Sequence, residues 1–406
     1  MPLRAKVATS VSNTAAALSR AAGRGDGSVI GGWIGLKIDP ELLEHLAIGR
    51  AVALVSGTNG KTTTTRLTAA ALGVLGPVAT NSFGANMPTG HTSALAKAGS
   101  TPFAVLEVDE HYLAQVIDET TPRVVALLNL SRDQLDRAKE VAMMAQLWRT
   151  ALAAHPEVAV VGNADDPMVV WAAINTAHVT WFSAGQRWHD DSWVCPECGS
   201  PIERANGDWW CTGCPLRRPQ PQWIVEDDGV LDPKGDWHLV KLQLPGHVNV
   251  GNAATALAVA AEFGVRPLEA VPRLASVSSV AGRYAQVDRD GRNIRLLLAK
   301  NPASWLEAFD MAEDAPTLLS VNARDPDGFD TSWLYDVDFS PLRGRSVLIT
   351  GDRAFDLAVR LEVNLVPFRH VQTFDEAIQA TPPGRLEVIA NYTAFQDIRA
   401  ELDRVN

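Results

Sequence analysis

Apolar residues in the first half of the chain gather in short runs that alternate with longer stretches of helical pattern. The first run covers residues 51–55 and is followed by a Gly-rich turn and a helical stretch from Lys61 to about Leu75. Such alternation is typical of parallel strands whose connecting helices cover both faces of the sheet. We therefore predict a parallel α/β domain. Its further strand candidates are residues 104–108, 124–128 and 158–161.

A second alternation of the same kind begins near residue 286. It predicts a separate, smaller, Rossmann-like α/β domain over residues 286–406. Residues 1–49 are interpreted as an N-terminal arm with one short helix, which leaves residues 50–285 as the central domain. The strand candidates of the C-terminal domain are residues 294–298, 317–321, 346–350 and 386–390, and its helix candidates are residues 302–312, 353–362 and 393–404.

Charge and hydropathy exclude several classes of protein. The chain has 406 residues and a formal net charge of −11, which argues against a nucleic-acid-binding surface. The sequence contains no run of about 18 apolar residues, so no transmembrane segment is predicted. Residues 7–22 mix polar residues with Ala, so no signal peptide is predicted. We expect a cytoplasmic protein without a nucleic-acid partner.

The turn after the first apolar run has the pattern of a phosphate-binding loop. Glycines let the backbone approach a phosphate, the helix N-terminus adds a positive dipole end, and Lys61 is placed to reach the β- and γ-phosphates of ATP. The Thr62 hydroxyl is expected to bind Mg²⁺. An ordinary strand-to-helix turn is the competing interpretation. The candidate nucleotide-binding residues of this loop are Gly57, Thr58, Asn59, Gly60, Lys61, Thr62 and Thr63.

All four cysteines lie between residues 195 and 214, as two Cys-x-x-Cys pairs. The pairs are Cys195 with Cys198 and Cys211 with Cys214. Four thiolates suit a closed tetrahedral Zn²⁺ site, which is structural because no coordination position stays open. A redox dithiol needs only one pair, so zinc is favoured. We predict a zinc ribbon inserted at about residues 190–222 that stabilises the fold of the insertion.

The sequence Gly-Thr-Asn-Gly-Lys-Thr-Thr resembles the phosphate loop of the Mur ligase superfamily, and the resemblance extends over most of the chain. In that family a Glu at the end of a strand holds a metal ion. Glu107 matches this position and is the candidate Mg²⁺ ligand, with Glu110 as the second choice. A solvated acidic turn is the competing interpretation. The resemblance implies an ATP-dependent ligase with a Mur-ligase-like central domain.

Two further segments resemble family patterns near the nucleotide. The segment that begins at Gly246 resembles the one that packs near the adenine, which makes Asn249 and Asn252 candidate nucleotide contacts. Helix capping is the competing role for both asparagines. Arg283 follows a Gly, as in the family's Gly-Arg at the junction of the central and C-terminal domains, where an Arg reaches phosphate.

Three departures separate the chain from amino-acid-adding members of the superfamily. The phosphate loop starts at Gly57, which leaves no room for an N-terminal domain that binds a uridine nucleotide. Gln134 stands where most relatives have His, and Gln is the poorer ligand for a second metal ion. Lys300 stands where those relatives carry the His of Asp-Tyr-Ala-His-Asn-Pro. A stand-alone Mur-type or folylpolyglutamate-type amino-acid ligase is therefore the alternative function.

Residues 325–338 contain five Asp among aromatic residues, which is more than a turn needs. This segment, the cysteine insertion and residues 351–354 resemble the MurT family of ligases. That resemblance implies a heterodimer with the glutaminase GatD, which supplies ammonia. It also implies amidation of the α-carboxylate of D-glutamate in the stem peptide of lipid II, through an acyl phosphate, at the inner membrane face.

In the MurT family an Asp of the C-terminal domain completes the partner's Cys–His site. The resemblance makes Asp330 the first choice for this role and Asp327 the second. Asp336 and Asp338 stay open as alternatives. A loop carboxylate that caps the following turn is the competing interpretation for Asp330.

Overall fold

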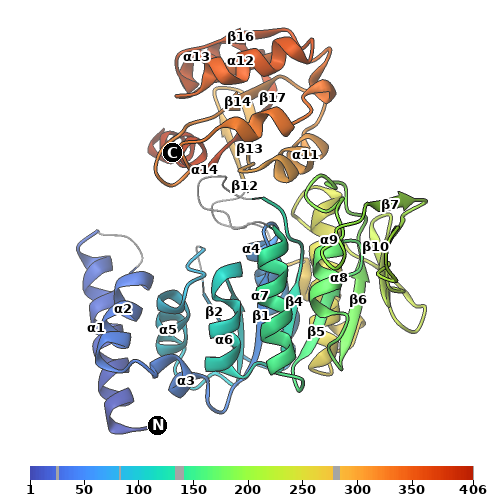
Figure 1. Cartoon of the computed structure of the whole chain (residues 1–406). Helices are drawn as coiled ribbons and strands as arrows, with labels where there is room; N and C mark the ends of the chain where they lie inside the picture. The colour runs from blue at the N-terminus through green and yellow to red at the C-terminus, as the bar shows by residue number, and fades with distance from the viewer. Residues whose placement is uncertain (24–26, 82–83, 133–140, 278–283, 406) are drawn as a thin grey trace. The chain divides into compact units, whose positions relative to one another are not determined.

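The computed structural model describes residues 1–23, 27–81, 84–132, 141–277 and 284–405. The chain divides into two compact units (Figure 1). Unit 1 comprises Met1–Leu130, Glu140–Leu244 and Val248–Ser278, and unit 2 comprises Ser131–Lys139, Pro245–His247 and Ser279–Asn406. The domain limits expected from the sequence, at residues 49/50 and 285/286, stay a prediction. No helix in the described part of the chain is long and apolar enough to cross a membrane.

Unit 1 is built on a nine-stranded sheet of order β11-β10-β9-β6-β5-β4-β1-β3-β2. In this sheet order, each pair of neighbours from β2 through β6 to β9 is parallel. The remaining pairs, β9 with β10 and β10 with β11, are antiparallel. The four predicted strands correspond to β1, β3, β4 and β5. The strands are β1 (Ala51–Ser56), β2 (Val78–Thr80), β3 (Phe103–Glu107), β4 (Val124–Leu127), β5 (Ala159–Asn163), β6 (Val179–Ser183), β9 (Trp223–Glu226), β10 (Gly229–Leu231) and β11 (Trp237–Leu239).

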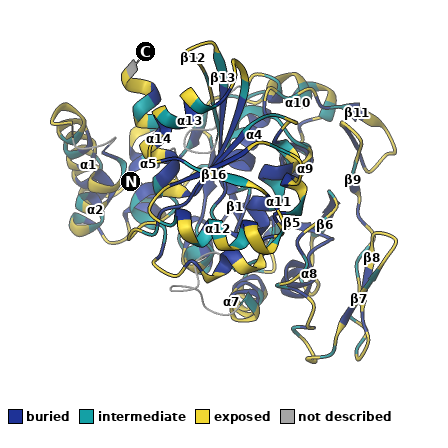
Figure 2. Cartoon of the chain, turned by 90° about the horizontal axis from the view of Figure 1, so that it is seen from above, coloured by how far each residue is buried: buried dark blue, intermediate teal, exposed yellow. Residues whose placement is uncertain are grey.

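Helices cover both faces of this sheet because successive side chains of its central strand point to opposite faces. Val52 and Leu54 of β1 belong to one hydrophobic core, and Ala53 and Val55 belong to another. Figure 2 shows buried strands between helices whose outward faces are exposed. The helices are α4 (Lys61–Leu72), α5 (Pro88–Lys97), η1 (Glu110–Tyr112), α6 (Leu113–Thr120), α7 (Val141–Ala154), α8 (Pro167–Ala173), α9 (His247–Glu262) and α10 (Pro267–Leu274).

Three helices precede the sheet. They are α1 (Leu3–Ala21), α2 (Ser28–Ile38) and α3 (Leu42–Ala47). α1 and α2 pack against each other and against α5, at the edge of unit 1 beside β2 (Figure 1). The sequence indicated one short helix here, because the glycines of α2 suggested a turn-rich stretch. Gly32 lies so close to α5 that a Cβ there would be 1.7 Å from the Thr89 oxygen, which explains its presence inside a helix.

The cysteine-containing insertion is a small hairpin of β7 (Ile202–Ala205) and β8 (Asp208–Cys211), which pair antiparallel. It follows β6 and precedes β9, so it is inserted in the chain between two strands that are parallel neighbours in the large sheet. The Trp209 indole is buried and donates to the Ala164 oxygen at 2.9 Å, which anchors the hairpin to the loop after β5.

Unit 2 has a six-stranded sheet of order β12-β13-β17-β14-β15-β16, parallel except for β12. The predicted strands correspond to β13, β14, β15 and β17, whereas β12, β16 and α13 were not predicted. The elements are β12 (Tyr284–Arg289), β13 (Arg292–Leu298), α11 (Pro302–Met311), β14 (Thr317–Ser320), η2 (Ser332–Asp336), η3 (Ser340–Leu342), β15 (Val347–Thr350), α12 (Ala354–Val363), β16 (Phe368–His370), α13 (Phe374–Ala380), β17 (Gly384–Ala390) and α14 (Tyr392–Val405).

Candidate active site and metal centre

The phosphate loop connects β1 to α4 at the carboxyl end of the parallel strands of unit 1. Gly57 and Gly60 have φ values of 144° and 83°, which favour glycine at both positions. A Cβ at Gly57 would lie 2.8 Å from the Leu128 Cβ, and one at Gly60 would lie 2.7 Å from the Asn252 Oδ1. α4 starts at Lys61 directly after the loop. The strand, loop and helix N-terminus therefore have the arrangement that holds phosphates.

The Lys61 side chain is buried within the phosphate loop. Its ammonium donates to the Gly57 oxygen at 2.5 Å and to the Thr58 oxygen at 3.3 Å. It also forms an ion pair with the Glu110 Oε2 at 3.0 Å. A phosphate oxygen is an anionic acceptor like this carboxylate, so the position of Lys61 is compatible with a phosphate contact, and its contact with ATP stays a prediction. The next residue, Thr62, lies buried in the first turn of α4, together with Thr63.

Asn129 holds the phosphate loop from the neighbouring strand, β4. Its side chain accepts from the Asn59 N–H at 2.9 Å and donates to the Asn59 oxygen at 3.1 Å. The Asn129 backbone oxygen accepts from the Thr58 N–H at 3.0 Å. Asn129 was not among the predicted site residues. Its place directly after an apolar run, at the sheet edge where the loop lies, is the signal that points to it.

The two predicted asparagines of α9 lie against the phosphate loop and its helix. The Asn252 Oδ1 accepts from the Thr64 hydroxyl at 3.1 Å, and the Asn252 Nδ2 donates to the Asn249 Oδ1 at 3.0 Å. Both asparagines are buried. The structure therefore brings them to the loop that begins α4, where they position Gly60 and Thr64, and their contact with a nucleotide stays a prediction.

The end of β3 and the short helix η1 that follows it carry the two candidate metal-binding carboxylates. Glu107 is buried, and its backbone is fixed on both sides: Asn81 accepts from its N–H at 2.8 Å, and its oxygen accepts from Asn81 at 2.8 Å and from the His91 Nε2 at 2.7 Å. Burial lowers the pKa of His91 to about 4, so this ring is neutral at pH 7. Glu110 is the carboxylate that pairs with Lys61. Asn81 and His91 were not predicted, since neither lies in a recognisable motif.

Several predicted residues lie outside the described part of the chain. Arg283, the candidate phosphate contact at the domain junction, is one of them, and Gln134 is another.

Among the described residues, the four cysteines are the one group of three or more His, Cys, Asp or Glu side chains that could share an ion. Mg²⁺ beside a nucleotide usually has one or two carboxylates, with phosphate and water as the other ligands. Glu107 with Thr62 is compatible with that pattern.

The four cysteines come together as the sequence predicts. Their sulfur atoms all lie within 4.8 Å of one another, and the sulfurs of Cys195 and Cys214 and of Cys198 and Cys211 are 3.7 and 3.4 Å apart. A tetrahedral zinc site with Zn–S bonds of about 2.3 Å requires sulfur separations of about 3.8 Å. The Gly213 N–H also points at the Cys211 sulfur, at 3.3 Å. The cluster is therefore compatible with zinc.

Polar contacts connect the insertion to the large sheet. Arg218, which follows the second cysteine pair, bonds to the Asp165 Oδ1 at 2.9 Å and to the Ser183 hydroxyl at 2.7 Å. The neighbouring Asp166 is fully buried, and it accepts from the Leu130 N–H at 2.9 Å and from the first turn of α8. Burial raises the pKa of the Asp166 carboxyl to about 6. The insertion is thus fixed to the loop after β5 and to the end of β6, and Asp166 connects that loop to the residues after β4.

The Asp-rich segment of unit 2 contains aspartates in two different settings. Asp327 accepts from the Thr393 N–H at 2.8 Å and from the Thr393 hydroxyl, so it fixes the first turn of α14. Asp338 accepts from the Ser340 N–H at 2.9 Å. Asp330 is exposed and accepts from the Ser332 N–H at 2.8 Å, and this bond lowers the pKa of Asp330. The capping role foreseen as the competing interpretation is therefore present at Asp330.

Asp330 also lines a hollow of about 320 Å³ within unit 2. Charged and aromatic side chains border the same hollow, among them Phe329, Tyr335, Arg353 and Asp356. Asp327 does not line it. An exposed, ionised carboxylate at the edge of a hollow is accessible to a second protein, whereas the contacts of Asp327 hold α14. Asp330 therefore remains the first choice and Asp327 the second, and the role of either in a partner's site stays a prediction.

Comparison with known proteins places these features in a family. The Mur ligase middle domain matches residues 55–199, and the MurT ligase C-terminal domain matches residues 298–395. A pseudomurein peptide ligase type C from Methanothermus fervidus has the same fold, with a TM-score of 0.68 and 18% identity over 90% of this chain and 81% of that chain. Folylpolyglutamate synthase of Mycobacterium tuberculosis, complexed with ADP, has a TM-score of 0.58 and 17% identity, covering 89% and 92% of the two chains.

The chain therefore contains the middle domain of Mur ligases and the C-terminal domain of MurT ligases, which supports an ATP-dependent ligase. Over nearly its whole length it is similar to proteins named subunit MurT of lipid II isoglutaminyl synthase (glutamine-hydrolyzing). It is 29% identical to the Staphylococcus aureus (strain COL) protein over 95% of both chains. It is 28% identical to the Streptococcus pneumoniae protein over 92% of both. The predicted fold class and the predicted resemblance to Mur ligases and to MurT are confirmed.

Proposed function

We propose that this ligase converts the α-carboxylate of D-glutamate in the stem peptide of lipid II into the amide, giving D-isoglutamine. The observation that supports the proposal is the union of a Mur ligase middle domain with a MurT C-terminal domain in a chain that aligns over 95% of its length with a MurT subunit. At Lys300 the sequence departs from the ligases that add an amino acid. This departure agrees with a ligase that joins ammonia, and not an amino acid, to the substrate carboxylate.

The chemistry takes two steps. A carboxylate oxygen of the substrate attacks the γ-phosphorus of ATP, and ADP leaves, which forms an acyl phosphate. Ammonia then attacks the acyl carbon, phosphate leaves and one proton is released. The first step needs charge neutralisation and alignment at the γ-phosphate. Lys61 and the N–H groups of the phosphate loop supply these, and Thr62 with Glu107 would hold the Mg²⁺ that neutralises the remaining charge.

Zinc is proposed as the structural ion of the insertion. The four sulfurs lie within 4.8 Å of one another, which is compatible with tetrahedral coordination, and four cysteine ligands would leave no position for a substrate. Because Arg218 and Trp209 connect the insertion to the loops after β5 and β6, loss of the ion would loosen these loops as well. We therefore assign zinc to folding and not to the ligation.

A glutaminase of the GatD type is proposed as the partner that supplies ammonia, in a heterodimer located in the cytoplasm at the inner membrane face. Ammonia has to reach the acyl phosphate without protonation, which requires a closely docked source. Asp330 is proposed to orient the catalytic His of the partner's Cys–His site, since it is exposed, ionised and placed beside a hollow.

The experiment compares glutamine with ammonium as the nitrogen source. Asp330→Asn keeps the oxygen that accepts from the Ser332 N–H but loses the charge that stabilises an imidazolium. Amidation of lipid II should fall by about 100-fold or more with glutamine and stay near wild type with high ammonium chloride. Asp375→Asn is the control, because Asp375 is an exposed carboxylate of unit 2 that lies outside the Asp-rich segment. Equal loss of both activities in Asp330→Asn would refute the shared-site role.

A stand-alone amino-acid ligase is the second candidate function. It is favoured by 29% identity to the UDP-N-acetylmuramate–L-alanine ligase of Thermobifida fusca, although the alignment covers 64% of that protein. The two candidates predict different products from the same assay. With lipid II, ATP and a mixture of ammonium and free amino acids, the proposed enzyme yields only the primary amide.

A further inference from the structure

The first two helices bury their small residues and expose their large apolar residues. The residues of α1 that face the protein are Ala5, Ala8, Ser12 and Ala16, and those of α2 are Gly31, Gly32 and Gly35. The exposed apolar residues are Leu3, Val7, Val11 and Leu18 on α1 and Val29, Ile30 and Trp33 on α2. This arrangement is the reverse of an ordinary amphipathic helix on a soluble protein, whose large apolar side chains face the core.

The packing explains why the small residues face inward. A Cβ at Gly31 would lie 2.9 Å from the Ser12 oxygen, and one at Gly35 would lie 2.7 Å from Leu42. α1, α2 and α5 therefore approach one another closely, and no room remains between them for large side chains. The large apolar residues of α1 share one helical stripe, because positions 3, 7, 11 and 18 are separated by four, four and seven residues. The exposed stripe is thus fixed by the fold.

The charge of this region is opposite to that of the chain. The first 38 residues contain five basic residues and one acidic residue, whereas the whole chain has a net charge of −11. No Asp or Glu occurs within α1 or α2. Lys6 and Lys37 are exposed beside the apolar residues, and the Lys37 ammonium lies 5.7 Å from the centre of the Trp33 ring. An apolar stripe, basic flanks and an exposed Trp are the features of helices that lie in a membrane interface.

We propose that the outward face of α1 and α2 binds the surface of a bilayer that contains anionic phospholipids. The apolar side chains enter the boundary between headgroups and acyl chains, and the basic side chains contact lipid phosphates. Trp33 lies at the level of the headgroups. The helices lie in the surface and do not cross it, in agreement with the lack of a spanning helix among the described residues. This inference goes beyond the proposed function, since it concerns membrane binding by the outward face of α1 and α2 and not the amidation reaction.

The test is sedimentation of the full chain with vesicles. Wild-type protein should bind vesicles of phosphatidylcholine with phosphatidylglycerol at low salt, bind pure phosphatidylcholine vesicles at least about tenfold more weakly, and lose affinity as salt is raised. The charge variant is Lys6→Glu with Lys37→Glu, and the apolar variant is Leu3→Ser with Trp33→Ser. Each should weaken binding to the anionic vesicles by about tenfold or more.

Matched controls make the changes elsewhere on the surface of unit 1. Lys234→Glu with Lys241→Glu is the charge control, because both lysines are exposed. Leu268→Ser with Trp193→Ser is the apolar control, because these side chains are 75% and 66% exposed, against 79% for Leu3 and 51% for Trp33. All variants should have the circular dichroism spectrum of the wild type, since the changed residues lie on the surface.

Three outcomes would overturn the proposal. They are no binding of the wild type to anionic vesicles, equal weakening in the variants and their controls, and a concentration-dependent dimer that the α1–α2 variants abolish while vesicle binding is absent. The last result would assign the face to a second copy of the chain. None of these readouts uses amidation, so a failure here leaves the proposed function untouched.

Discussion

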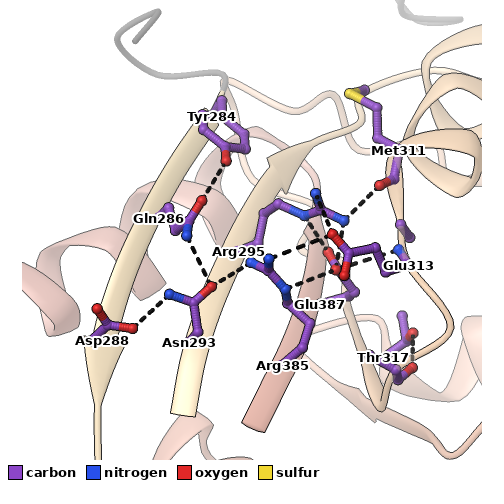
Figure 3. A network of polar contacts seen from close by, with 12 residues as sticks. Tyr284, Gln286, Asp288, Asn293, Arg295, Met311, Glu313, Thr317, Arg385 and Glu387 are labelled. Carbon is purple, nitrogen blue, oxygen red and sulfur yellow. Dashed lines mark hydrogen bonds and ion pairs between the residues drawn. The ribbon is translucent and has the colours of Figure 1, made fainter. Parts of the chain in front are cut away.

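A buried ion pair in unit 2 allows the strength of one interaction to be worked out from the geometry. The Arg295 guanidinium of β13 donates to both Glu387 carboxylate oxygens of β17, at 2.8 and 2.7 Å (Figure 3). Glu387 has no exposed surface, and Arg295 is also buried. Glu313 lies 3.4 Å from Arg295 and Arg385 lies 3.9 Å from Glu387, so two arginines and two glutamates form one network.

Glu387→Gln removes one charge from this network and keeps the shape of the side chain. Breaking a buried pair leaves an uncompensated charge, which costs about 3–5 kcal/mol. Glu313 remains near Arg295 but is 56% exposed, so its compensation is partial and the cost should lie near the lower end, at about 3 kcal/mol. The double change Arg295→Met with Glu387→Leu should cost much less, because no buried charge is left.

Hydrogen exchange measured by mass spectrometry is the assay, because a chain of two units does not unfold in one step. Amides of β13 and β17 in Glu387→Gln should exchange about 100-fold faster than in wild type, as expected for a loss of about 3 kcal/mol. Asp375→Asn is the control. This variant breaks the ion pair between Asp375 and Arg289. It should change the free energy of the opening that allows exchange by less than about 1 kcal/mol. Unchanged exchange in Glu387→Gln, or equal effects of the double and single variants, would refute the reasoning.

Two other predictions concern the candidate sites. Lys61→Ala and Glu107→Ala should each lower ATP-dependent amidation by at least about 100-fold with glutamine and with ammonium alike, while circular dichroism stays as in wild type; activity of either variant at the wild-type level would remove that residue from the site. Elemental analysis of protein purified without chelator should find one zinc ion per chain and none in Cys198→Ser, whose residues 190–222 should exchange amide hydrogens faster; zinc-free wild type would contradict the four-cysteine site.

The sequence predicted best those features that depend on local pattern. The strand before Gly57, the glycines of the loop and the helix that starts at Lys61 follow from periodicity and from the needs of a phosphate. The cysteine cluster follows from spacing, since two Cys-x-x-Cys pairs have few other uses. Short edge strands such as β2 and β16 were missed because three residues carry too little periodicity to stand out.

The supporting residues of the site could not be predicted, because their roles depend on tertiary contacts. Asn129 is 70 residues from Asn59 in the sequence, and Asn81 is 26 residues from Glu107; only the order of the parallel strands brings each pair together. The pairing of Lys61 with Glu110, the second choice for the metal site, is of the same kind. The inverted burial of α1 could not be predicted either, since the sequence does not say which face of α1 packs against α2 and α5.

The most direct test of the central claim follows the oxygen of the substrate carboxylate. Lipid II that carries oxygen-18 in the α-carboxylate of its D-glutamate is incubated with the purified chain, ATP, Mg²⁺ and ammonium chloride, and the products are analysed by mass spectrometry. An acyl phosphate requires that one labelled oxygen leaves with the inorganic phosphate for each primary amide formed. That transfer, together with ADP as the nucleotide product, is the predicted result. Label in AMP, a product extended by an amino acid, or no ATP-dependent amide would contradict the account.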